Sequence, residues 1–244
     1  MEIKAGLMDF EALNKMVRAD AEDGKKLVLR EVNGQRYIGC GLCGSAEIDV
    51  YGTPGNDMAA FLNGPSITVY GNGQDQLGNT MNAGTVVVHG SVGDTAGYSM
   101  RGGEIFVKGS AGSRVGIHMK AYKEHHPVLV IGGSVGDFCG EYMAGGTLIV
   151  LGQGGKPSPI TRYCASGIHG GKLVLRGEVS PSQIAREADV LPMDEETLSE
   201  IEPLIERWCG YFGGDKRELL SGKFTLIKPK GKNPFARLYT NNVY

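Results

Sequence analysis

Seven short runs along the chain have an aliphatic residue at every second position, and each run is followed by a glycine. IDVY at 48–51 and VVVH at 86–89 are examples. Period-two alternation places every second side chain on the same face of a β-strand. The pattern therefore predicts seven strands that each bury one face. On that face every residue is aliphatic: Ile48, Val50, Ile67, Val69, Val86, Val88, Ile105, Val107, Leu129, Ile131, Leu148, Val150, Leu173 and Leu175.

The seven runs recur at nearly constant spacing. The glycines that follow them are separated by 19, 19, 19, 24, 19 and 25 residues. Units of about 19 residues are too short for a helix pair or a propeller blade, but they suit one coil of a solenoid. The sequence therefore predicts an all-β solenoid of about seven coils. The two longer steps predict loops at 121–127 and 153–170, and both are candidates for ligand binding.

Small residues and one large apolar residue recur at fixed places inside each unit. Leu62, Met81, Met100, Met119 and Met143 come ten places after the strand-ending glycine, and we expect them to point inward. Coils this short turn sharply, and glycine reaches positive φ without a steric penalty. The repeat glycines are therefore interpreted as structural: Gly52, Gly71, Gly90, Gly93, Gly97, Gly109, Gly112, Gly116, Gly133, Gly136, Gly140 and Gly152.

Three regions are expected along the chain. Residues 1–39 should form a helix capped by Asp9 and a hairpin that turns on Asn33-Gly34. Residues 40–180 should form the solenoid. Residues 181–244 should form a helix that begins at Asp194, is kinked or restarted by Pro203, and is followed by an extended tail. We expect this helical region to cover the open end of the solenoid, because an unpaired strand edge would otherwise recruit other chains.

Composition and charge remove several functional classes. The chain has 39 glycines in 244 residues, and its 25 basic residues do not exceed its 27 acidic ones. There is no basic excess that would favour nucleic acid or anionic lipid. Charges near the amino terminus interrupt any apolar run of the kind that a signal peptide or membrane span needs. Five scattered cysteines fit reduced thiols, so we expect a cytoplasmic protein.

One short motif suggests a hydrolase. GGSVG at 132–136 matches G-x-S-x-G, in which a nucleophilic serine, here Ser134, sits on a turn between a strand and a helix. No helix is expected after it, and Ser91 and Ser110 occupy the same place in other units. His118 or His169 could act as its base, but nothing in the sequence pairs either with it. We interpret Ser134 as a turn hydroxyl and keep the hydrolase as an alternative.

Cysteine and histidine motifs offer little more. Cys40 and Cys43 could bind a metal or form a redox pair, yet a structural zinc site needs a second pair of ligands. His125 and His126 follow Glu124 in the first loop and could bind a metal adventitiously. The simpler expectation is two free thiols and two solvated imidazoles.

Three other residues have plausible structural roles. Asp94 and Asp137 share one register in the repeat, which indicates that each caps a turn. Trp208 fits the apolar face of the carboxyl-terminal helix. Taken together, the residues predict no catalytic, cofactor-binding or metal site.

The repeat resembles a known family. GSVGDTAG at 90–97, GSAGSRVG at 109–116 and GSVGDFCG at 133–140 resemble the GXGXG repeat of the C-terminal domain of the glutamate synthase large subunit. The resemblance covers about residues 36–180. The segment ETLSEIEPLIERWCGYFGGDKRELLSGKFTLIKPK at 196–230 also resembles the helix and closing segment of that family. A right-handed parallel β-helix is implied, here as a separately encoded third domain of the archaeal type.

The resemblance also implies a function. In glutamate synthase this domain is non-catalytic and packs against the glutaminase and FMN-binding domains, so it supplies no catalytic residues to carry over. The expected role is a structural subunit of a complex that makes glutamate from glutamine and 2-oxoglutarate. FMN and iron–sulfur clusters would belong to its partner subunits. The alternatives are the β-helical subunit of formylmethanofuran dehydrogenase and a subunit of N-methylglutamate synthase. A homo-oligomer is a further candidate assembly.

Overall fold

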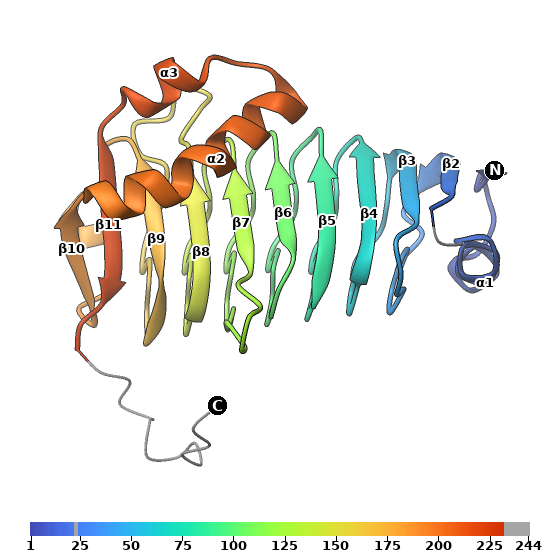
Figure 1. Cartoon of the computed structure of the whole chain (residues 1–244), viewed down its shortest axis with the longest axis horizontal. Helices are drawn as coiled ribbons and strands as arrows, with labels where there is room; N and C mark the ends of the chain where they lie inside the picture. The colour runs from blue at the N-terminus through green and yellow to red at the C-terminus, as the bar shows by residue number, and fades with distance from the viewer. Residues whose placement is uncertain (22–23, 232–244) are drawn as a thin grey trace, which may run out of the picture.

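The computed structural model describes residues 1–21 and 24–231, and eleven strands form one sheet in the order β1-β2-β3-β4-β5-β6-β7-β8-β9-β11-β10 (Figure 1). Within this part of the chain, no helix combines the length and apolar character needed to cross a membrane. The elements are β1 (Glu2–Lys4), α1 (Phe10–Asp20), β2 (Lys26–Asn33), β3 (Glu47–Thr53), β4 (Asn63–Tyr70), β5 (Ala83–Val88), β6 (Glu104–Val107), β7 (Val128–Ile131), β8 (Ala144–Val150), β9 (Gly170–Arg176), a 3₁₀ helix (Pro181–Gln183), β10 (Ala188–Pro192), α2 (Glu195–Phe212), α3 (Lys216–Leu220) and β11 (Phe224–Pro229).

The predicted β-solenoid is confirmed. The seven expected strands are β3 to β9, and each pairs in parallel with the next in the predicted register, so that Ile48 aligns with Ile67 and Ile67 with Val86. All fourteen predicted inward side chains are at most 1% exposed. Seven strands joined by six turns match the expected coil number closely. The inward column of Leu62, Met81, Met100, Met119 and Met143 is also fully buried, at 0% exposure.

Glycine is required in these coils for two different reasons, a left-handed backbone at some positions and a close approach of neighbouring coils at others. Only the first is expected from the sequence. Gly97 has φ of 71°, in the left-handed region. Gly112 has no such conformation; instead, its Cα faces the preceding coil so closely that a Cβ would overlap Asp94 Oδ1 and lie 2.8 Å from Asp94 N. Glycine is therefore required at Gly112 by the close approach of two coils.

The predicted amino-terminal hairpin is wrong. β2 pairs in parallel with both β1 and β3, so it is already a strand of the solenoid. At Gly34, with φ of 81°, the chain turns into the first coil and does not fold back on β2. Gln35 stabilises this path, because its Oε1 accepts the Asn33 N–H and its Nε2 donates to the carbonyl groups of Gly6 and Met8.

Helix α2 lies along the outer face of the sheet and does not cap the end of the solenoid as expected (Figure 1). A second apolar cluster forms there because the outward residues of β6 to β9 are apolar, and it contains Phe106, Val130, Ile149, Val174, Ile201, Ile205 and Trp208. At the other end of the molecule, α1 buries Leu13 and Val17 against the interior core and covers the amino-terminal end. Asp9 caps α1 as predicted.

The predicted start of α2 is confirmed, but the predicted restart is wrong. Asp194 accepts the Thr197 N–H at 2.7 Å, as an N-cap does. The helix then continues without a break through Pro203. Tertiary packing of its buried face outweighs the hydrogen bond that proline removes. The expected third region extends to residue 244, and its residues 232–244 lie outside the described part of the chain.

Acid should loosen α2. Hydrogen bonding to Thr197, supported by Lys228, lowers the pKa of Asp194 from an ordinary 3.8 to about 2. Because the folded-state pKa is depressed, the stabilisation from this carboxylate is complete above pH 4 and is lost as the pH falls toward 2. Amide hydrogen exchange in α2 should accelerate through that window. In Asp194→Asn, which keeps a cap that does not titrate, the acceleration should be smaller. Asp137 titrates in the same range and is present in both proteins, so its contribution to the pH dependence is the same in both. An identical exchange profile for the two proteins would therefore contradict the assignment to Asp194.

Candidate functional site

Ser134 belongs to a ladder of side-chain hydrogen bonds that runs along the solenoid. Asn72 Oδ1 accepts the Ser91 N–H at 2.9 Å, Ser91 Oγ accepts the Ser110 N–H at 3.1 Å, and Ser110 Oγ accepts the Ser134 N–H at 3.1 Å. Each side chain thus satisfies the backbone of the next coil where the strand ladder has ended. Residues that occupy equivalent places in the repeat thus lie above one another in successive coils.

Within the described part of the chain, neither His118 nor His169 forms a catalytic pair with Ser134. Ser134 is 4% exposed, and its hydroxyl lies 3.4 Å from the hydroxyl of Ser110. His118 stacks on the Tyr142 ring, and His169 Nδ1 lies 3.0 Å from the Gly167 carbonyl oxygen. The geometry therefore favours the turn-hydroxyl interpretation of Ser134.

A parallel ladder explains the two aspartates. Asp94 Oδ1 accepts the Ser113 N–H at 2.7 Å, and Asp137 Oδ1 accepts the Arg162 N–H at 3.1 Å. The Arg162 guanidinium also donates to Asp137 Oδ2 at 2.8 Å. These bonds, above all those from Arg162 and then the Thr161 hydroxyl, lower the pKa of Asp137 to about 2. Both aspartates thus cap a turn, as predicted, although the turn belongs to the following coil.

Cys40 and Cys43 occupy different places in the first coil. Cys40 is half-buried, and burial raises the pKa of its thiol. Cys43 is exposed and pairs with Asn63 of the next coil, whose Nδ2 lies 3.9 Å from Cys43 Sγ. Among the described residues, no group of three or more His, Cys, Asp or Glu side chains could hold a metal ion.

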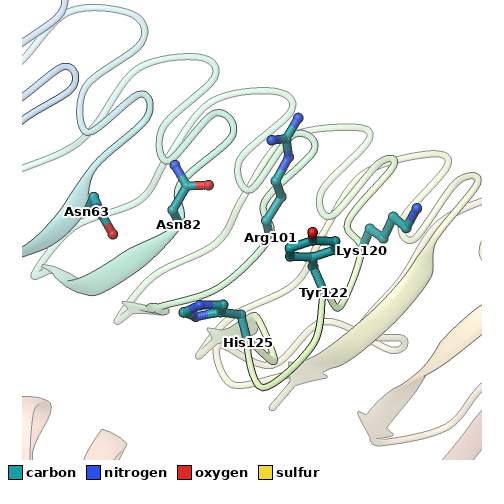
Figure 2. A pocket seen from close by; sticks show the side chains of 6 residues that line it. All are labelled: Asn63, Asn82, Arg101, Lys120, Tyr122 and His125. Atoms are coloured by element: carbon teal, nitrogen blue, oxygen red, sulfur yellow. The ribbon is translucent and has the colours of Figure 1, made fainter. Parts of the chain in front are cut away.

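A polar groove of about 620 Å³ opens beside the first long loop. We call it the polar groove and define it by six residues: Asn63, Asn82, Arg101, Lys120, Tyr122 and His125. Figure 2 shows the first four in a row across successive coils, with Tyr122 between Arg101 and Lys120. Each of the four follows the inward Leu or Met of its coil directly, so the groove is a column of the repeat whose side chains face outward.

Backbone hydrogen bonds fix the floor of the polar groove. Arg101 N donates to Met81 O at 2.9 Å, and Lys120 N donates to Met100 O at 2.9 Å. The same pattern holds Asn63 and Asn82, whose N–H groups bond to the preceding coil at 2.8 Å. The four side chains therefore stand on rigid backbone at the spacing of neighbouring coils, about 4.8 Å.

The loop at 121–127 forms the wall of the polar groove. Tyr122 and His125 exchange two backbone hydrogen bonds, of 3.0 and 2.9 Å, which close a tight turn. This turn folds back toward the coil at Gly102, where a Cβ would lie 3.0 Å from His125 Cβ. His126 faces the other side of the loop and lines a second cavity of about 500 Å³. The structure thus separates the two adjacent histidines.

The second long loop is shorter than expected. Val135 N donates to Pro159 O, Phe138 N to Arg162 O and Tyr142 N to Ser166 O, at 2.9, 2.9 and 2.7 Å. These bonds continue the coil-to-coil ladder, so most of 159–168 belongs to a regular coil. The predicted loop at 153–170 is therefore confined to the residues before Pro159.

Aromatic residues occupy left-handed backbone positions on another edge of the solenoid. His118, Phe138, Tyr142 and Tyr163 have φ of 55°, 60°, 50° and 59°, and we call these four residues the aromatic edge. Positive φ is a true outlier for bulky side chains and costs about 1–3 kcal/mol per residue. Tyr142 and Tyr163 nevertheless remain 43% and 53% exposed.

The aromatic edge is ordered by stacking. His118 stacks on Tyr142 with ring centroids 5.3 Å apart, and Phe138 stacks on Tyr163 at 4.9 Å. The Arg114 guanidinium lies over the Phe138 ring and also pairs with Glu141 at 3.0 Å. The edge is thus a rigid exposed surface of rings and paired charges.

Sequence reasoning identified the loop at 121–127 as a candidate binding loop, but it missed the column of residues that the loop covers, and it missed the aromatic edge. The polar groove follows the inward Leu and Met column by one residue, so the repeat register contained its signal. The aromatic edge carries the signal that bulky residues flank the repeat glycines Gly116 and Gly140. The repeat register does not indicate which residues of this column face a cavity, because the loop at 121–127 forms the wall of that cavity.

The solenoid with glycine-spaced coils defines the class of protein, and comparison with known proteins gives the family. Residues 26–230 match the GXGXG motif family, so the chain belongs to that family. An uncharacterized protein of Methanocaldococcus jannaschii is 45% identical over 249 residues, covering 98% of this chain and 95% of that protein. A chain of the formyltransferase/hydrolase complex of Methylorubrum extorquens, solved with methylofuran, has the same fold: its TM-score is 0.63 at 19% identity, over 94% of this chain and 96% of that one.

Proposed function

We propose that this protein is a non-catalytic structural subunit of a glutamate synthase-like complex. It joins a glutaminase subunit to an FMN-binding subunit, and FMN and iron–sulfur clusters belong to those partners. Membership of the GXGXG family supports the proposal, and so does the shared fold with a chain of a multi-subunit complex. The alternative parent complexes are formylmethanofuran dehydrogenase and N-methylglutamate synthase.

The aromatic edge is the observation that carries an interaction role. Positive φ recurs at the same register in other coils, as at Thr80 and Ser99, so the turn of the repeat imposes it. The same turn places Tyr142 and Tyr163 at the surface, where they remain 43% and 53% exposed although each stacks on a neighbouring ring. Tyrosine beside arginine is the composition of binding hot spots in protein interfaces. A partner subunit that covers these rings would gain free energy from burial of their exposed apolar surface.

Affinity purification of the tagged full chain from its native extract tests the proposal. Co-purification of a glutaminase and an FMN-containing subunit, with glutamate formed from glutamine and 2-oxoglutarate, is the expected result. Subunits that contain molybdenum or tungsten would instead support the formylmethanofuran dehydrogenase alternative. A chain that remains without partners at every salt concentration tried would contradict both.

Tyr142→Gly separates assembly from folding. Glycine relieves the left-handed strain at φ of 50° but loses the stacking on His118, so the two effects offset and stability should change by at most about 1 kcal/mol. Binding of the partner should weaken by roughly 30-fold or more, as expected for a tyrosine hot spot. Ser99→Gly is the matched control, because Ser99 has the same place in its coil and φ of 52°. Unchanged partner binding in Tyr142→Gly would remove the aromatic edge from the interface.

A further inference from the structure

The size and construction of the polar groove fit a small-molecule site. Its volume of about 620 Å³ lies within the usual range of ligand pockets. Its floor is held by coil-to-coil hydrogen bonds and its wall by the closed turn of Tyr122 and His125. Side chains on such rigid elements are positioned without a large loss of entropy on binding. This inference is independent of the proposed scaffold role.

The six residues that define the polar groove include two cationic groups and no carboxylate. Arg101 and Lys120 lie in register on neighbouring coils, about 4.8 Å apart along the axis. The guanidinium of Arg101 can donate two parallel hydrogen bonds to a carboxylate or phosphate group.

Arg101 differs from arginines on neighbouring surfaces. Arg114 pairs with Glu141 at 3.0 Å, and Arg162 pairs with Asp137 at 2.8 Å. Across residues 1–21 and 24–231, Arg101 forms no ion pair. The coil that positions Arg101 therefore leaves its guanidinium beside a cavity, with no acidic partner among the described residues.

The remaining lining residues suit the body of a polar ligand. Asn63 and Asn82 continue the row beyond Arg101 and offer amide donors and acceptors. The Tyr122 ring lies between Arg101 and Lys120 and offers both an apolar face and a hydroxyl group (Figure 2). One end of the polar groove is thus cationic and the other neutral.

We propose that the polar groove binds a small anionic molecule, with a carboxylate or phosphate group held between Arg101 and Lys120 and its polar body along Asn82 and Asn63. Carboxylate and phosphate share the oxygen chemistry that these cations recognise.

Calorimetric titration of the purified full chain with two probes, glutarate and inorganic pyrophosphate, tests this assignment. At least one probe should bind with a dissociation constant of about 1 mM or lower. Glutarate alone would indicate a carboxylate ligand and pyrophosphate alone a phosphate ligand, and both would support the shared chemistry. If neither probe binds at concentrations up to about 10 mM, the assignment is overturned.

Charge-matched variants separate the groove from general electrostatics. Arg101→Gln should weaken binding of the probe by about tenfold or more, because it removes charge-assisted hydrogen bonds. Lys108→Gln removes the same charge from the outer sheet face, where Lys108 lies near His89, and should leave the affinity within about twofold. Arg101→Lys should recover part of the loss. Equal weakening by Arg101→Gln and Lys108→Gln would show nonspecific attraction and would overturn the site. All side chains concerned are exposed, so each variant should melt with the parent.

Discussion

Trp208→Ala is expected to detach α2 from the outer face of the sheet. The Trp208 side chain is 2% exposed, its Nε1 donates to Val107 O at 2.9 Å, and its ring contacts Phe212 with centroids 5.2 Å apart. Truncation leaves a large cavity and a carbonyl oxygen without its side-chain donor, which should cost about 3–5 kcal/mol. Amide hydrogen exchange should rise along α2 while the solenoid interior remains protected.

Leu198→Ala is the control on the same helix. The sequence pattern places Leu198 on the apolar face of α2, but it is 37% exposed, so its truncation should cost less than about 1 kcal/mol. Trp208→Phe keeps an aromatic ring but removes the donor to Val107 and part of the indole, so its effect should fall between the two. If Trp208→Ala destabilised no more than Leu198→Ala in denaturant unfolding, packing of α2 on the outer face would not be a major source of stability.

Gly112→Ala is expected to destabilise the solenoid itself, by about 3 kcal/mol. A Cβ would overlap Asp94 Oδ1 and lie 2.8 Å from Asp94 N. The backbone cannot move aside easily, because Gly112 N donates to Gly93 O at 3.0 Å and Gly112 O accepts from Gly136 N at 2.8 Å. For a chain of this length the melting temperature should fall by roughly 6–12 °C, measured by calorimetry.

Gly210→Ala is the control variant and is expected to change stability in the opposite direction. Gly210 lies in α2, and no atom is within 4 Å of the position that its Cβ would take. Alanine is the better helix former, so this variant should be more stable by about 0.5–1 kcal/mol. A melting temperature for Gly112→Ala close to that of the parent would mean that neighbouring coils separate readily at this turn.

The interior of the solenoid could be predicted from sequence because each coil repeats one short local pattern. Ile67 and Val69 have the same inward position as Ile48 and Val50, so the recurrence reveals face, register and spacing together. A non-repeating segment lacks that redundancy. The hairpin prediction for β2 is wrong because Asn33-Gly34 is a common hairpin turn, whereas pairing with β3 decides the true path.

The amphipathic pattern of α2 indicates a buried face but not the surface that buries it. Ile201, Ile205 and Trp208 are expected to pack, and they do. Their partners lie far away in the sequence, among the outward residues Phe106 and Val130. The sequence pattern of one helix does not reveal which distant residues it contacts. Helix α2, which was expected to cover the end of the solenoid, therefore covers the outer face of the sheet instead.

The sequence by itself determined the solenoid, its inward residues and the structural role of its glycines, because these follow from steric rules that act within one coil and between adjacent copies of it. Only the tertiary structure decided where α2 docks, that Ser134 pairs with Ser110, and that Arg101 faces a cavity. Those outcomes depend on contacts between segments that share no pattern. The polar groove exists because the loop at 121–127 folds back over a column of the repeat.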